Sequence, residues 1–147
     1  MPMKNDKLPE LLAPAGNPAS LRAALHFGAD AVYCAMKHYG LRAFAGNFDE
    51  EELREGAALC HALGKKLYVT LNILPFDDQL EGMVTAARTA LACGADAAIV
   101  SDLGAIVTLR ERVPELPIHV STQASTVNAA AALHYHSLGC KRVILAR

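Results

Sequence analysis

The chain has 147 residues, of which 52% are hydrophobic and 20% are charged, the composition of an ordinary globular domain. Its net charge of −1 excludes an overall basic surface for nucleic acid and leaves RNA binding to a local patch. No apolar run reaches the roughly 18 residues of a membrane span. The polar start MPMKNDKLPE also lacks the apolar segment of a signal peptide. We therefore expect a cytoplasmic protein that has no membrane partner.

Short apolar runs alternate with helical segments along the whole chain. Four of these runs follow a glycine at the end of a helical segment, namely Gly28, Gly64, Gly94 and Gly139. Glycine suits the left-handed residue that closes a helix, and a continuous apolar run is typical of a parallel strand covered on both faces. The expected elements, in chain order, are strand 10–14, helix 18–27, strand 30–35, helix 49–63, strand 66–72, helix 78–93, strand 96–101, helix 103–113, strand 117–121, helix 126–138 and strand 141–146.

The strict alternation of six strands and five helices predicts a parallel α/β fold. The spacing favours a TIM-like (β/α) barrel, because neither a G-x-G-x-x-G after the first strand nor a P-loop motif is present. A closed barrel needs eight strand–helix units over about 250 residues. We therefore expect residues 1–147 to form one incomplete barrel domain, the N-terminal portion of a longer protein. Its open strand edges would suit self-association.

Several helix starts carry residues that commonly cap a first turn. Asn17 precedes a proline, and Asp49 is followed by Glu52 at the spacing of a capping box. The candidate caps of the three later helices are Asp77 or Asp78, then Asp102, then Thr122 or Ser125.

Polar side chains follow the strands at their carboxyl ends, where parallel α/β proteins gather functional groups. The candidate catalytic residues are Asn72, Asp102 and Gln123, and the candidate substrate-binding residues at these ends are Ser121 and Arg147. A capping role is the alternative for Asp102 and Thr122. The amides of Asn72 and Gln123 have less obvious use as caps.

The loop at residues 36–48 mixes cations with aromatic rings. Lys37, His38 and Arg42 are candidate substrate-binding residues, and they are interleaved with Tyr39, Phe44 and Phe48. Cations and rings together suit nucleotides, through phosphate contacts and stacking. The alternative is a loop packed on the barrel rim, with Phe48 as a hydrophobic staple before the next helix.

Motifs for metal binding and for hydrolysis are missing from the sequence. The four cysteines are far apart and the histidines lack ligand spacing, so we expect no metal site. Neither G-x-S-x-G nor H-E-x-x-H occurs. Serine-hydrolase or zinc-protease chemistry therefore has no support from motifs.

Six phrases in order give the chain a resemblance to a known family. They are LLAPAG at 11–16, GADAVY at 28–33, RAFAGNF at 42–48, VTLN at 69–72, VSD at 100–102 and HVSTQA at 119–124. Together they resemble the N-terminal barrel of peptidase family U32. That group contains collagenase-like peptidases, prephenate-dependent tRNA hydroxylases that make 5-hydroxyuridine at the wobble position, and a ribosomal RNA cytidine hydroxylase. The family's cysteine-rich region, linked to an iron–sulfur cluster, lies beyond residue 147, and none of the four cysteines here matches it.

Three alternative functions stay open, of which the resemblance implies the first two. The first is hydroxylation of a tRNA uridine, with prephenate as a needed metabolite and a cluster bound by downstream cysteines. Asn72, Asp102, Gln123 and Arg147 would then line the barrel mouth, and the basic loop residues would approach the RNA backbone. The second is a peptidase, although the sequence offers no nucleophile and base at recognisable spacing. The third is a truncated fragment or interaction module without catalysis.

Overall fold

A computed structural model of the protein describes residues 8–37 and 47–147. Six strands form one parallel sheet in chain order, and a helix follows each of the first five strands. The strands are β1 (Leu12–Pro14), β2 (Ala31–Ala35), β3 (Lys66–Leu71), β4 (Ala97–Val100), β5 (Ile118–Val120) and β6 (Arg142–Val143). The helices are α1 (Pro18–His26), α2 (Glu50–Ala62), α3 (Leu80–Ala92), α4 (Leu103–Arg112) and α5 (Ala129–Ser137), with 3-10 helices η1 (Asp77–Gln79) and η2 (Thr122–Ala124).

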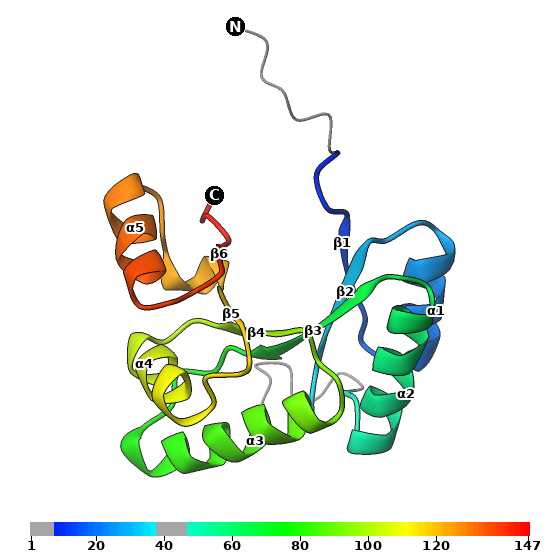
Figure 1. The fold of residues 1–147 in the computed structure, drawn as a ribbon, viewed down its shortest axis with the longest axis horizontal. Coiled ribbons are helices and arrows are strands. Elements are labelled where there is room, and N and C mark those ends of the chain that lie inside the picture. Colours follow the sequence, from blue (N-terminus) through cyan, green and yellow to red (C-terminus); the bar gives the residue numbers. More distant parts are fainter. Residues whose placement is uncertain (1–7, 38–46) are drawn as a thin grey trace, which may run out of the picture.

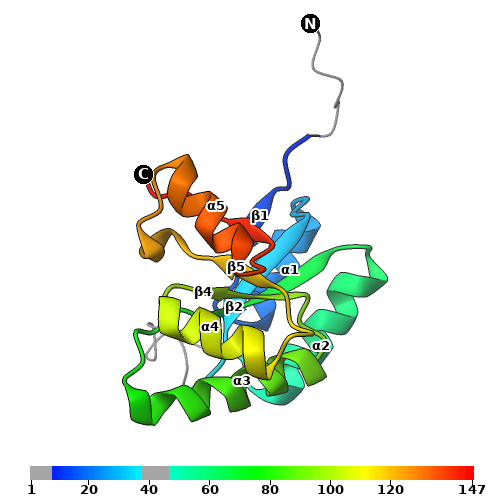
Figure 2. The same cartoon turned by 60° about the vertical axis from the view of Figure 1, so that its left-hand side comes forward.

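The sheet curves into half of a TIM-like barrel, which confirms the predicted fold class. Figure 1 shows the five helices around the outside of the sheet, following one another in chain order from α1 to α5. Figure 2 shows α3 and α4, which are in contact, on this outer side. In the described part of the chain β1 and β6 each pair with one neighbour, so self-association through these edges stays a prediction. No helix in residues 8–37 and 47–147 is both long and apolar enough to cross a membrane.

The two faces of the sheet carry separate apolar clusters because strand side chains alternate. On the outer face Val32, Leu67 and Val69 join a large core with the buried sides of the helices. On the inner face a smaller cluster forms around Ala31 and Tyr68, with Ala97 and Ile99 from the next strand. The helix side therefore supplies most of the buried apolar surface, and the inner face is left partly open.

The repeated Gly-Ala-Asp sequence ties neighbouring strands together at their N-terminal ends. The Asp30 carboxylate, just before β2, accepts the Leu11 amide just before β1 at 3.0 Å. The Asp96 carboxylate, just before β4, accepts the Leu67 amide of β3 at 2.8 Å. The glycines of both repeats have positive φ, 95° at Gly28 and 96° at Gly94. Each repeat thus closes a helix and aligns the start of the next strand with the strand before it.

Three predicted helix caps are confirmed. Asn17 accepts the Ser20 amide at 2.8 Å, and Asp49 and Glu52 form the reciprocal bonds of a capping box at 2.9 and 3.0 Å. Asp102 accepts the Ala105 amide at the start of α4 at 2.8 Å. Phe48, directly before Asp49, is fully buried in the outer core, so the packing alternative holds for that ring.

Two other predicted caps are wrong. Asp77 and Asp78 lie inside η1 rather than capping α3, which begins only at Leu80. In the last helix Asn128 is the cap and accepts the Ala131 amide at 3.0 Å. Thr122 does not cap it, because the chain first forms η2.

The last predicted helix and strand are both shorter than expected. Ser125, the other predicted cap of α5, closes η2 in the left-handed region at φ 56°. β6 ends at Val143. Beyond it the Ile144 amide still donates to the Val120 carbonyl of β5, and the Ala146 amide donates to the Thr126 carbonyl on the loop after β5.

Candidate functional site

A cavity of about 530 Å³ lies on the inner face of the half-barrel, toward the C-terminal ends of the strands. All six strands contribute to it, either directly or through the residues that follow them. Leu12, Tyr33, Ile99 and Ile144 give it apolar walls. Its polar groups come from the strand ends and from the loop after β5. The cavity therefore offers apolar contact on one side and hydrogen bonding on the other.

Four of the predicted site residues come together in this cavity. Asn72 follows β3, Ser121 and Gln123 follow β5, and Arg147 follows β6. Parallel strands bring these positions to one rim although they are distant in sequence. Among the described residues, no Asp or Glu lines the cavity. The polar side chains of the lining can donate and accept hydrogen bonds, and the charged side chain among them is that of Arg147.

The other predicted site residues do not join this group. Asp102 does not line the cavity, and its carboxylate is engaged at the start of α4. Lys37 lies 3.2 Å from the Asp49 carboxylate and 3.6 Å from that of Glu52, at the beginning of α2. Those carboxylates raise the pKa of the Lys37 ammonium. His38 and Arg42 lie outside the described residues.

Gln123 is fixed at both its backbone and its side chain. Its backbone amide donates to the Ser121 hydroxyl at 3.3 Å, and its side-chain oxygen accepts from the Ser101 hydroxyl at 3.1 Å. Both serines are buried, whereas the Gln123 side chain is exposed to the cavity mouth. By contrast, no hydrogen bond to the half-buried Asn72 amide group is found in the described part of the chain.

Sequence reasoning missed the inward-facing residues below the rim. Tyr33 and Thr70 line the cavity, and the Thr70 hydroxyl donates to the Cys34 carbonyl at 3.2 Å. The available signal was the alternation of side chains along each strand, which puts Tyr33, Ala35, Tyr68, Thr70 and Asn72 on the same face.

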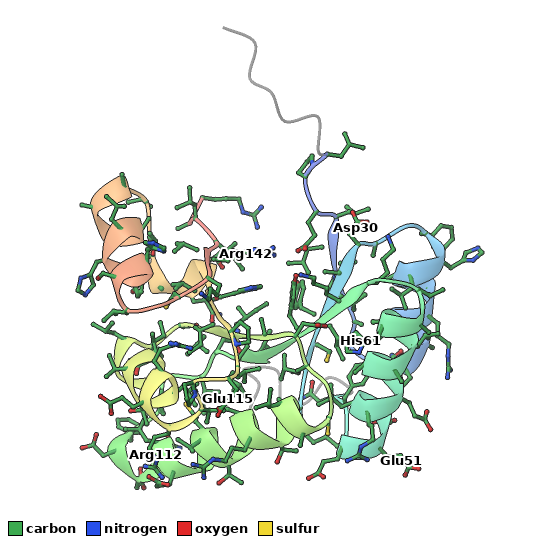
Figure 3. All side chains as sticks on the ribbon, in the orientation of Figure 1. Asp30, Glu51, His61, Arg112, Glu115 and Arg142 are labelled. Carbon is green, nitrogen blue, oxygen red and sulfur yellow. The ribbon has the colours of Figure 1, made fainter. Side chains whose placement is uncertain are left out.

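A partly buried polar cluster, also missed, lies on the inner side of the half-barrel. Arg142 donates to the Glu10 carboxylate at 2.6 and 3.4 Å, and the Tyr68 hydroxyl donates to it at 3.0 Å. The Arg142 side chain lies in the space between β6 and β1 (Figure 3), with its guanidinium carbon 5.5 Å from the centre of the Tyr68 ring. These contacts join the two edges of the sheet across its hollow side.

The cluster shifts the ionisation of its members. The Arg142 guanidinium is the main cause that holds the pKa of Glu10 below its usual value, with help from the Tyr68 hydroxyl. Burial, followed by the hydrogen bond to Glu10, raises the pKa of Tyr68 to about 12. Burial and then Arg142 lower the pKa of His119 to about 4. The His119 ring packs edge-on against Tyr68, with 4.7 Å between the ring centres, and its buried Nδ1 has no hydrogen-bond partner among the described residues.

The cysteines of this chain do not fit an iron–sulfur cluster. All four are buried and unpaired with one another, and burial is the main cause that raises the pKa of each thiol, to about 12 for Cys34 and about 11 for Cys60. Cluster ligands are thiolates, which need a lowered pKa. Within residues 8–37 and 47–147, no group of three or more Cys, His, Asp or Glu is placed to hold a metal.

Comparison with known proteins relates the chain to one family. The family model of Peptidase family U32 matches residues 16–147. The tRNA hydroxylation protein P of Escherichia coli is 44% identical over 139 residues, which are 95% of this chain and 31% of that protein. The Collagenase of Porphyromonas gingivalis is 36% identical over 94% of this chain and 33% of its own length. The chain thus spans about a third of these relatives.

A solved structure supports the fold independently. The U32 peptidase Mk0906 superposes with a TM-score of 0.73 at 14% identity, covering 99% of this chain and 61% of that one.

Proposed function

The chain belongs to peptidase family U32, and on that premise we propose that it is part of a protein that hydroxylates a tRNA uridine at the wobble position, using prephenate. The tRNA hydroxylation proteins supply the reaction and the RNA class for this proposal. The observation that carries it is the cavity, which combines donors, one guanidinium and apolar walls with no described carboxylate. A small dicarboxylate with an apolar ring, such as prephenate, matches that lining.

Each cavity residue has a proposed part in this site. Arg147 pairs with a carboxylate of the metabolite, for which a planar guanidinium is suited. Asn72 and Gln123 bind or orient the reacting groups, with Ser121 beside them. Lys37, which does not line the cavity, is proposed to contact the RNA backbone, as are His38 and Arg42, which lie outside the described residues. Asp102 stays a candidate by its position after β4, although its carboxylate already accepts the Ala105 amide.

The test is the nucleoside content of tRNA from cells with and without the gene for this chain. We expect 5-hydroxyuridine to disappear on deletion and to return with the unmodified gene. Arg147→Ala and Asn72→Ala should fail to restore it. Arg112→Ala serves as the matched control, because Arg112 lies on the outer surface and pairs with Glu81 at 2.8 Å. Unchanged 5-hydroxyuridine on deletion would rule the proposal out.

A peptidase is the second candidate, favoured by the relative named Collagenase. The cavity holds Cys34, Ser121 and Thr122, but its described lining contains neither histidine nor carboxylate to activate them. The pKa of about 12 keeps the Cys34 thiol protonated at neutral pH. Gelatin hydrolysis that persists through purification and is lost in Ser121→Ala would support this candidate over the first.

A further inference from the structure

We infer that Gln123 acts in the cavity as a hydrogen-bond donor that Ser101 holds in position, and that its partner is a carboxylate of a small metabolite. The inference rests on the proposed function, because it takes the cavity as the substrate site. It adds a positioning residue, Ser101, which does not line the cavity. It also assigns which end of the Gln123 amide, the NH₂ group, is available to the ligand.

The hydrogen bonds of Ser101 determine which way the Gln123 amide faces. The Ser101 hydroxyl lies 3.1 Å from the side-chain oxygen of Gln123 and 3.5 Å from the carbonyl of Asn72. A hydroxyl has one proton, and 3.5 Å is too long for a good O–H···O bond. Reversing the amide would force Ser101 to donate over that longer distance. The oxygen of Gln123 therefore faces Ser101, and its NH₂ group is directed elsewhere.

The backbone around Gln123 is held as firmly as its side chain. Ser121 accepts the Gln123 amide, and both Ser101 and Ser121 are only 5% exposed. Ser125 closes the same turn at φ 56°, a conformation that residues other than glycine rarely adopt. Strain of this kind persists where surrounding contacts fix the backbone. The backbone amide and the side-chain oxygen of Gln123 are thus both hydrogen-bonded within the chain, which leaves its NH₂ group for a ligand.

The charge of the lining identifies the ligand chemistry. The NH₂ group of Gln123 has no partner in the described part of the chain, and the same holds for the Asn72 amide and the Arg147 guanidinium. These unused donors share a cavity that lacks described carboxylates. An oxygen acceptor that carries negative charge satisfies them best, since hydrogen bonds to ionised acceptors are the stronger ones.

The experiment follows the Gln123 side chain directly by nuclear magnetic resonance of the nitrogen-15-labelled chain. The NH₂ resonances are assigned by their loss in Gln123→Glu, and prephenate is the probe. We expect saturable shifts of these resonances. Loss of one hydrogen bond should weaken binding about tenfold in Gln123→Ala. Ser101→Ala should weaken it severalfold in the unmodified chain and have no further effect in the Gln123→Ala background.

The matched control is Ser137→Ala, which removes an exposed hydroxyl from α5 that donates to the carbonyl of His134. It should bind prephenate as the unmodified chain does. If Ser101→Ala weakens binding equally in both backgrounds, Ser101 supports the fold in general and the positioning role is wrong. Absence of prephenate binding, or binding that leaves the Gln123 resonances unmoved, overturns the inference.

Uridine is the second probe, and it separates a base carbonyl from a metabolite carboxylate. Shifts caused by uridine and not by prephenate would overturn the carboxylate assignment. The tRNA measurement above is independent of this one. If 5-hydroxyuridine does not depend on the gene while the binding results hold, the proposed reaction fails and the role of Gln123 stands. If 5-hydroxyuridine depends on the gene while the binding results fail, the role of Gln123 is wrong and the proposed reaction stands.

Discussion

The ion pair between Glu10 and Arg142 should measurably stabilise the half-barrel, because it joins elements 132 residues apart. The test is a double-mutant cycle with Glu10→Gln and Arg142→Met. Glutamine keeps an acceptor for the Tyr68 hydroxyl, and methionine keeps an apolar stem beside the Tyr68 ring. The cycle then reports the charge interaction with little loss of packing.

The magnitude follows from the exposure of the pair. Exposed pairs contribute up to about 1 kcal/mol, and breaking a buried pair costs about 3–5 kcal/mol. The side chains of Arg142 and Glu10 are 38% and 26% exposed, which places the pair between these cases. We expect a coupling of about 1.5 kcal/mol, which for a chain of this size corresponds to about 5 °C in the unfolding midpoint.

Urea and thermal unfolding at pH 7 of the unmodified chain, the two single variants and the double variant give the coupling free energy. The same measurements in acid provide a control. The pKa of Glu10 is lowered in the folded protein, so its contribution is complete above the unfolded value near 4.5. It is lost as the pH falls through the folded pKa. A coupling near zero at pH 7, or one unchanged in acid, would refute the assignment of stability to this pair.

Three further predictions test individual groups. Folded His119 binds its proton near pH 4 and the unfolded chain near 6.5, so protons favour unfolding in that window. As the pH falls from 6.5 to 4, the free energy of unfolding of the unmodified protein, measured in urea, should therefore fall by up to about 3 kcal/mol more than that of His119→Phe. Parallel pH curves for the two proteins would contradict this. Cys34 should resist iodoacetamide at pH 8 in the folded chain and react only on unfolding, because burial raises its pKa to about 12; rapid native labelling would be the contrary result. Asn128→Ala should lower the free energy of unfolding by about 1 kcal/mol, because it removes the cap of α5. Thr122→Ala should lower it far less, and a larger loss in Thr122→Ala than in Asn128→Ala would show that α5 is capped differently.

The element order was readable from the sequence because strong local signals repeat. Gly28, Gly64, Gly94 and Gly139 all have positive φ, as their place at helix ends requires. The segment after β5 was not readable, since Thr122, Ser125 and Asn128 are all residues that cap helices. The choice among them depends on distant contacts, such as the bond between Ala146 and Thr126 that shapes this loop.

The rim of the cavity was also predictable, whereas the ion pair across the inner side of the sheet was not. Strand ends in a parallel fold meet on one side, which was enough to bring together Asn72, Gln123 and Arg147. Sequence offered both a site role and a capping role for Asp102, and only the fold shows that its carboxylate accepts the Ala105 amide at the start of α4. Sequence could not pair Glu10 with Arg142, because that contact needs the curvature of six strands.

The division of apolar side chains between two faces of the sheet has a consequence for how this domain tolerates change. Substitutions on the helix side, at positions such as Leu67 or Val69, should lower the amount of folded protein. Substitutions at cavity positions such as Asn72 or Gln123 should leave that amount nearly unchanged while altering what the protein binds. A scan that measures abundance and binding separately would then distinguish the helix-facing strand residues from the residues at the cavity rim, and ligand preference could be redesigned at the rim without rebuilding the core.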